Sequence, residues 1–334
     1  MKKSFLILFL LASFSIKAQD DTIKNIITEA TENSHLEILA HELLDIVGPR
    51  LTGTPQMRNA HDWAVQRYAD WGINAKIHEW GEWNGWERGI THIDMISPRV
   101  RTLSGIQLGY SPSTSLKGIT GELDVIPEVK NKDEFNAWLK TIKGKFILSS
   151  MYQITGRPDY NWEEYATPES FKKMKETRSE ATRNWNSNFR KMGINRRQIS
   201  KILEDAGAIG LLSSNWAGGF GANRIFSTGT KTIPHLDIEL EDYSMLYRMV
   251  ESGSGPEIRV VSTSKDLGIV PTFNTLAEIK GVEKPDEYVI LSAHFDSWDG
   301  ATGATDNGTG TIVMMEAMRV LKAMYPNPKR TILV

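Results

Sequence analysis

The chain has 334 residues, of which 40% are hydrophobic and 24% charged, with a formal net charge of −2. A single domain usually has about 100 to 150 residues, so we expect two domains. The nearly neutral charge provides no general attraction for nucleic acid or an anionic membrane surface, which argues against both partners. Cysteine is absent, so stability must come from packing or a bound metal rather than from disulfide bonds.

The chain begins with MKKSFLILFLLASFSIKAQ, in which two lysines precede an apolar run from Phe5 to Phe14. That run is shorter than the roughly 20 helical residues needed to cross a bilayer, which argues against a retained anchor. Ala18 provides a small residue for cleavage, so we predict a secretory signal peptide over residues 1–18. The mature protein is then expected to be periplasmic or extracellular, without a stable membrane span.

Two helices and a strand are predicted next. In SHLEILAHELLDIVG, apolar residues recur at helical spacing, Ser34 and Glu37 fit a capping box, and Gly48 ends the helix. PQMRNAHDWAVQRYADWGI repeats the helical spacing and ends at Gly72, before the strand-like NAKIHEW. This order is typical of the outer layer of an α/β domain.

From about Gln107 the sequence changes to short strands and turns, such as ITGELDV, KFILSS and PHLDIEL. QISKILEDAGAIGLLSS predicts a helix that turns at Gly207 into a buried strand, a compact α/β unit of its own. The charged stretch 157–200 between these elements predicts surface helix.

The last part predicts strands in TFNTLAEIKG and EYVILSA, an amphipathic helix in GTGTIVMMEAMRVLKAM, and another strand in KRTILV. Strand, helix and strand in this order indicate an α/β fold with a mostly parallel, doubly wound sheet. Ligands of such sheets bind beyond the carboxyl ends of the strands. HFDSWDGATGATDNGTG, residues 294–310, falls at this place.

Three residues of this loop are candidates for a metal site. His294, expected at a strand end, can ligate a metal through its imidazole, and Asp296 can accept the other ring N–H and orient it. Asp306 can return a second carboxylate towards His294. If Asp306 bridges two Zn²⁺ ions, a water between them becomes a hydroxide near neutral pH.

An Asp- and Gly-rich loop can also be simple turn chemistry, and a lone His with one Asp is a weak metal signal. Glycines would permit the left-handed backbone that a metal loop needs, and Thr309 or Thr311 could cap the following helix. The four glycines concerned are Gly300, Gly303, Gly308 and Gly310. Surface or packing roles are expected for the other histidines, His35, His41, His61, His78, His92 and His235.

SAHFDSWDGATGATDNGTG resembles the metal-binding signature of the co-catalytic dizinc exopeptidases, the family of zinc aminopeptidases and glutamate carboxypeptidases. The resemblance implies zinc ligands at His294 and Asp306, an orienting role for Asp296, and a cis peptide bond between Asp306 and Asn307. DIVGPRLTGTP and KILEDAGAIGLLSS resemble the plasma glutamate carboxypeptidase branch, which carries an inserted protease-associated (PA) domain.

This resemblance implies that residues 19–106 begin the peptidase domain, 107–264 form the PA domain, and 265–334 hold the metal loop of an incomplete zinc exopeptidase fold. It also implies a Glu-Glu pair beyond RTILV, whose first Glu is the general base, and then an Asp and a His. Because the sequence ends at Val334 before any of these, we expect a fragment of a longer reading frame that is inactive by itself.

The resulting hypothesis is an exported dizinc exopeptidase acting on dipeptides or short peptides, with two zinc ions per complete site. The related enzyme is a dimer, which leaves a homodimer open. A receptor-like binding protein on the same scaffold and a single-zinc aminoacyl cyclase are the alternatives. The three candidate residues argue against the receptor, and His294 favours two metals over one.

Overall fold

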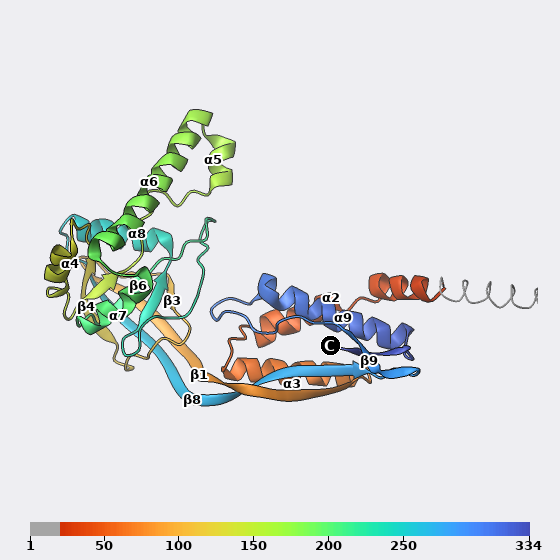
Figure 1. The fold of residues 1–334 in the computed structure, drawn as a ribbon. Coiled ribbons are helices and arrows are strands. Elements are labelled where there is room, and N and C mark those ends of the chain that lie inside the picture. The colour runs from red at the N-terminus through yellow and green to blue at the C-terminus, as the bar shows by residue number, and fades with distance from the viewer. Residues whose placement is uncertain (1–20) are drawn as a thin grey trace, which may run out of the picture. The chain divides into compact units, whose positions relative to one another are not determined.

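The computed structural model describes residues 21–334, so the predicted signal peptide lies outside the described residues. The chain divides into two compact units (Figure 1). Unit 1 comprises the chain up to Gly85 together with Gly268–Val334, and unit 2 comprises Trp86–Leu267. The second unit is thus an insertion in the first, while its assignment to the PA class stays a prediction. Within residues 21–334, no helix combines the length and apolar character needed to cross a membrane.

Unit 1 begins with helical residues 21–32, then α2 (Leu36–Ala40), which continues as the π-helical η1 (His41–Val47), and α3 (Pro55–Asp70). The predicted capping box at the start of α2 is wrong. His35 occupies the N-cap position, and its backbone N–H donates to Glu316 Oε1 at 3.1 Å. The Ser34 hydroxyl accepts from Leu36 N instead, so a tertiary contact replaces the local cap.

The sheet of unit 1 contains β8 (Glu257–Ile279), β9 (Lys284–Ile290) and β10 (Arg330–Leu333). β10 is parallel to β9 and antiparallel to β8. α9 (Thr309–Met324) connects β9 to β10, which confirms the predicted strand–helix–strand unit. β8 is one long strand that begins well before the predicted strand TFNTLAEIKG and includes most of it, and both β8 and β1 (Asn74–Ser97) contribute residues to both units.

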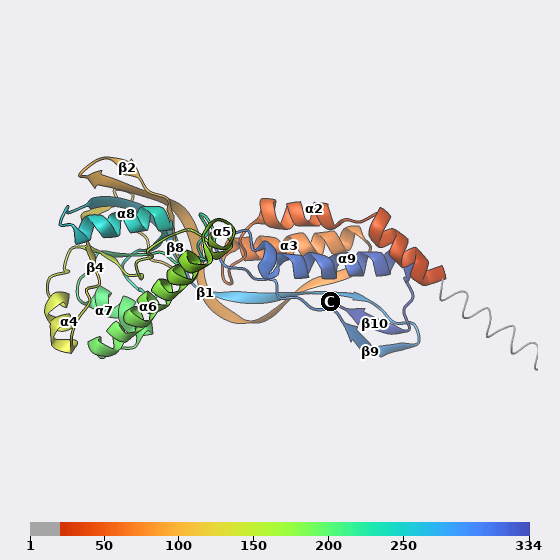
Figure 2. The same cartoon turned by 90° about the horizontal axis from the view of Figure 1, so that it is seen from above.

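The core of unit 1 lies between its helices and its sheet. Figure 1 and Figure 2 both show α2 and α9 side by side. Buried side chains from α2, η1, α3, α9, β8 and β10 pack together: Leu39, Leu43, Ala60, Ala64, Tyr68, Ala277, Ile279, Ile312, Met315, Met318 and Ile332. β9 carries the apolar residues Tyr288, Val289 and Ile290, yet most of its residues are exposed. Among the described strands β9 pairs only with β10, so its other edge is uncovered.

Unit 2 is built on four neighbouring parallel strands, β4 (Ile119–Val125), β5 (Phe146–Leu148), β6 (Gly210–Ser213) and β7 (His235–Ile238). β3 (Gly105–Gln107) pairs antiparallel with β7, β8 pairs antiparallel with β4, and the short β2 (Arg101–Thr102) pairs antiparallel with β1. The expected α/β fold with a mostly parallel central sheet is therefore confirmed, with antiparallel strands added at its margins.

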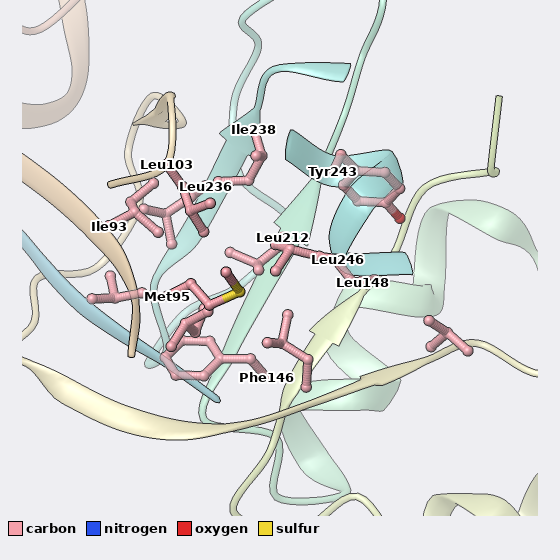
Figure 3. Packing of buried hydrophobic residues seen from close by; sticks show 14 residues of the cluster. Ile93, Met95, Leu103, Phe146, Leu148, Leu212, Leu236, Ile238, Tyr243 and Leu246 are labelled. Carbon is pink, nitrogen blue, oxygen red and sulfur yellow. The ribbon is translucent and has the colours of Figure 1, made fainter. Parts of the chain in front are cut away.

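Successive side chains of a strand point to opposite faces of the sheet. The strands of unit 2 have buried apolar residues on both faces, and helices cover each face. Leu148 and Leu212 pack with Tyr243 of α8 (Leu240–Glu251) in one cluster (Figure 3). Ile147 and Leu211, their neighbours in the chain, belong to a second cluster. That cluster includes residues of α4 (Lys132–Leu139), α6 (Pro168–Met192) and α7 (Ile199–Asp205), which follows the 3₁₀ turn η2 (Arg196–Gln198). The predicted surface helix is α6 together with α5 (Asp159–Tyr165).

Candidate metal site between strand β9 and helix α9

The loop with the candidate metal residues lies between β9 and η3 (Ala304–Gly308), a short turn with non-helical backbone angles at Asp306 and Asn307 that leads into α9. β9 ends at Ile290, so His294 lies four residues beyond the strand rather than at its last position. The backbone carbonyl of His294 accepts from Thr311 Oγ1 at 3.3 Å and from Asn307 Nδ2 at 3.4 Å. The start of α9 therefore holds the backbone that carries the imidazole.

The structure brings the three predicted residues together around the imidazole of His294. Nδ1 lies 3.1 Å from Asp296 Oδ1, and Nε2 lies 2.9 Å from Asp306 Oδ1. All three side chains are at least half exposed, so these contacts add little to the free energy of folding. Their value lies in the geometry, because one ring is held between two carboxylates.

A neutral imidazole carries one N–H and can therefore donate to only one of these two carboxylates. With Asp296 accepting from Nδ1, the lone pair of Nε2 faces the Asp306 carboxylate. One nitrogen lone pair and one carboxylate oxygen that face each other are donors of the kind that Zn²⁺ binds. The donor atoms of His294 and Asp306 thus fit a zinc ion. A neutral imidazole forms no ion pair with the Asp306 carboxylate, so such a pair does not take the place of the metal.

The number of donors is smaller than a zinc site needs. Among residues 21–334, no group of three or more His, Cys, Asp or Glu side chains is placed to hold a metal ion together. Zinc in proteins has three or four protein ligands. His294 and Asp306 can therefore form only part of a metal site.

The backbone of this loop agrees with the expectation in one respect and corrects it in others. The peptide bond between Asp306 and Asn307 is cis, as the resemblance implied. Gly300 and Gly303 adopt positive φ angles of 90° and 67°, as expected for left-handed positions. Helix α9 has Gly308 at its N-cap position without a side-chain cap, so the predicted threonine cap is wrong.

Close packing, rather than a left-handed backbone, explains the two remaining glycines. A Cβ atom on Gly308 would lie 2.5 Å from Leu44 Cδ2, and one on Gly310 would lie 2.4 Å from Asn307 Oδ1. Atoms cannot approach so closely without displacement, so any side chain at these positions would move the start of α9 or the Asn307 amide.

Arg50, in the turn that follows η1, is a residue of this site that sequence reasoning missed. Its side chain is completely buried, although arginine is rarely buried in proteins. Burial lowers the pKa of the Arg50 guanidinium, and the negative charge of Asp296 acts in the opposite direction. The sequence carries only one signal for it, the flanking GPRLTGTP motif, and that motif does not reveal which loop the guanidinium contacts.

Two of the other histidines are buried packing residues, as expected. The ring of His61 packs edge-on against Phe295 of the metal loop, at 5.1 Å between ring centroids, and its Nδ1 lies 2.8 Å from Thr275 Oγ1. Burial lowers the pKa of His61 to about 4, with a further contribution from Arg58. His235 in unit 2 is also buried, and its pKa is lowered to about 4 by burial.

Comparison with known proteins supports the resemblance. Residues 274–334, which include the metal loop, match peptidase family M28. The chain is 27% identical to carboxypeptidase Q of Pongo abelii over 321 residues, which covers 95% of this chain and 61% of that protein. Human carboxypeptidase Q is 28% identical over 291 residues, covering 87% of this chain and 55% of that protein. The chain thus spans little more than half the length of these curated relatives.

Solved structures show the same fold. The peptidase M28 precursor from Shewanella amazonensis has a TM-score of 0.61 at 22% identity, covering 95% of this chain and 66% of that one. BSAP, a zinc aminopeptidase from Bacillus subtilis, has a TM-score of 0.54 at 19% identity, covering 90% of this chain and 60% of that one. The expected resemblance to the zinc exopeptidases and the expected fold class are both confirmed.

Proposed function

We propose that this chain, whose residues 274–334 match peptidase family M28, contributes to a zinc-dependent exopeptidase that hydrolyses dipeptides or short peptides. His294 and Asp306 are the proposed zinc ligands, and Asp296 orients the His294 ring. The observation that carries the proposal is the 2.9 Å distance between His294 Nε2 and Asp306 Oδ1, with Asp296 on the other ring nitrogen. Similarity to carboxypeptidase Q supports the exopeptidase class, and the zinc aminopeptidase supports the metal.

The described residues have distinct tasks in this proposal. Asp296 accepts a hydrogen bond from Nδ1–H of His294, which fixes the tautomer and leaves the Nε2 lone pair free for the metal. Asp306 brings the negative charge that offsets a divalent cation. A bound zinc ion supplies a Lewis acid that polarises a peptide carbonyl and lowers the pKa of water.

Several finer parts of the hypothesis are proposed with it. One is a second zinc ion, for which Asp306 would also be a ligand. The others are a glutamate general base, a PA-type identity for unit 2 and an exported location. The resemblance of the metal loop, the similarity to carboxypeptidase Q over most of this chain and the apolar start of the sequence support them. Because the described residues bring together only two metal donors, we expect the 334-residue chain by itself to bind zinc weakly and to hydrolyse no peptide.

Zinc binding is the experiment that tests the proposal. Zinc content and affinity are measured by isothermal titration calorimetry on the 334-residue chain and on the complete product of its gene. His294→Ala and Asp306→Asn should each lower the affinity at least tenfold. His41→Ala is the matched control, because His41 and Asp45 form another exposed pair with 2.9 Å between Nδ1 and Oδ2.

The possible results separate the hypotheses. Two zinc ions per complete chain, lost in both site variants but not in the control, support the dizinc exopeptidase. One zinc ion per chain favours the single-zinc cyclase. A complete protein that binds no zinc, or that binds it equally well in all variants, overturns the enzyme proposal and favours a receptor-like binding protein.

A further inference from the structure

The guanidinium of Arg50 donates to backbone carbonyls on both sides of the metal loop. Nε donates to Phe295 O at 3.0 Å, next to His294 and Asp296. Nη1 donates to Thr302 O at 3.0 Å and Nη2 to Gly303 O at 3.2 Å, just before the turn that carries Asp306. One rigid planar group therefore connects the segment that holds His294 to the segment that holds Asp306.

The backbone of Arg50 adds two further bonds to the same loop. Arg50 N donates to Ser297 Oγ, and Ser297 N donates to Arg50 O, both at 3.0 Å. Nη1 also donates to Gly48 O at 2.7 Å, which holds the side chain against its own turn. Arg50 is thus bonded to the loop by main chain and side chain together.

The buried guanidinium is surrounded by backbone carbonyl oxygens. Among residues 21–334, no carboxylate lies within ion-pair distance of Arg50, and all its side-chain hydrogen bonds go to carbonyl oxygens. A buried charge is costly unless hydrogen bonds compensate it, so these carbonyls must stay in place around the fork. Lysine cannot replace this arrangement. All its N–H donors lie on one nitrogen, whereas the five N–H groups of arginine lie in one plane on three nitrogens.

The loop packs closely around the fork. A Cβ atom on Gly303 would lie 2.3 Å from Ser297 Cβ and 2.9 Å from Arg50 Nη2. The two sides of the loop therefore approach each other as far as the atoms allow. The guanidinium bonds the Phe295 carbonyl on one side and the Thr302 and Gly303 carbonyls on the other. This arrangement limits how far His294 and Asp306 can separate.

We propose that Arg50 is a positioning residue that sets the spacing between His294 and Asp306 by bonding both sides of the metal loop. The proposal rests on the zinc site proposed above and adds the element that organises it. Arg50 touches neither ligand side chain, so it acts through the backbone rather than on metal or substrate.

The test compares Arg50→Lys with Arg319→Lys in the complete protein. Arg319 is the matched control, because it is also a buried arginine of unit 1 and lies on α9, yet it bonds Glu316, Glu29 and Asn33 O rather than the loop. We expect Arg50→Lys to lower zinc affinity about 10- to 100-fold, the usual effect of losing a group that orients a ligand. Arg319→Lys should lower thermal stability and leave zinc affinity unchanged.

Hydrogen exchange of the metal-free protein provides a second measurement. The Ser297 and Gly308 amides, which donate to Arg50 O and Gly303 O, should exchange faster in Arg50→Lys and at the wild-type rate in Arg319→Lys. If Arg50→Lys does not fold, Ser297→Ala removes one bond between Arg50 and the loop and should change both measurements in the same direction, by less. The Ser297 hydroxyl also donates to Trp298 O at 3.4 Å, a weak bond within the same segment.

The outcomes distinguish this inference from the proposed function. A wild-type protein that binds no zinc overturns the zinc site, while the exchange rates still report whether Arg50 holds the loop. Unchanged loop exchange in a folded Arg50→Lys protein overturns the positioning role, as does an equal loss of zinc affinity in the Arg50 and Arg319 variants.

Discussion

Acid should destabilise unit 2 through His235, a buried histidine on β7. Its Nδ1 lies 3.3 Å from Thr228 Oγ1, and its Nε2 is buried and has no hydrogen-bond partner among residues 21–334, so the imidazolium would lose its hydration at Nε2 without compensation. Burial lowers its pKa from 6.5 to about 4. The unfolded chain therefore binds more protons than the folded one between these values, and stability falls as the pH drops from about 6.5 towards 4.

The size of this effect follows from the two pKa values. At pH 5 the unfolded histidine is almost fully protonated and the folded one is mostly neutral. The free energy of unfolding should then be about 2 kcal/mol lower than at pH 7. His235→Leu removes this contribution with little change of volume, and Thr228 Oγ1 keeps its contact with Thr230 Oγ1 at 2.7 Å.

Hydrogen exchange of amides in β6 and β7, measured at pH 7 and pH 5, gives the unfolding free energy of unit 2 in each protein. Subtracting the variant from the wild type cancels other titrating groups, including buried Asp237, whose pKa burial raises. His92→Leu, at an exposed position of unit 2, is the control and should keep the wild-type pH dependence. If wild type and His235→Leu lose equal stability between pH 7 and pH 5, the reasoning from burial is refuted.

Two further substitutions test buried hydrogen bonds. The hydroxyl of fully buried Tyr243 donates to Ser150 O at 2.7 Å and accepts from Ser150 N at 2.8 Å, so Tyr243→Phe should cost about 2 to 4 kcal/mol in urea unfolding. A midpoint within error of wild type would contradict this. Glu316→Gln removes the carboxylate charge that lies 2.8 Å from Arg319 Nε, where both side chains are buried, and should lower the free energy of unfolding by about 2 to 3 kcal/mol. The loss is not larger because Glu29 still contacts the arginine. An unchanged midpoint would show that Glu29 alone satisfies the charge.

The sequence predicted the helices well where apolar spacing and end signals agreed. α3 begins at Pro55 after Thr54, whose side chain accepts from Met57 N, and it ends just before Gly72, which has a φ of 67°. α9 and β10 also lie where the pattern placed them, whereas β9 ends at Ile290, before the end of the predicted strand EYVILSA. Such features depend on residues within one or two turns of each other, so a local pattern contains the information.

Predictions that depended on the surroundings of an element were less successful. The apolar residues of β9 suggested burial, but the side chains of Tyr288, Val289 and Ile290 are about half exposed or more. The capping box of Ser34 failed because Glu316, 280 or so positions away in the chain, binds the residue that follows it. A pattern records which side chains are apolar or polar, whereas partners distant in sequence decide what covers them.

The metal loop shows the same division. Its own residues sufficed to predict that His294, Asp296 and Asp306 come together, because they lie within one short, glycine-rich loop that must turn between a strand and a helix. Sequence could not predict that Arg50 holds this loop, since 245 positions separate it from Phe295, whose carbonyl accepts from its Nε. Only the tertiary structure brings η1 and the loop together, because burying Leu39 and Leu43 of the α2–η1 segment against Ile312 and Met315 of α9 places the following turn beside the metal residues.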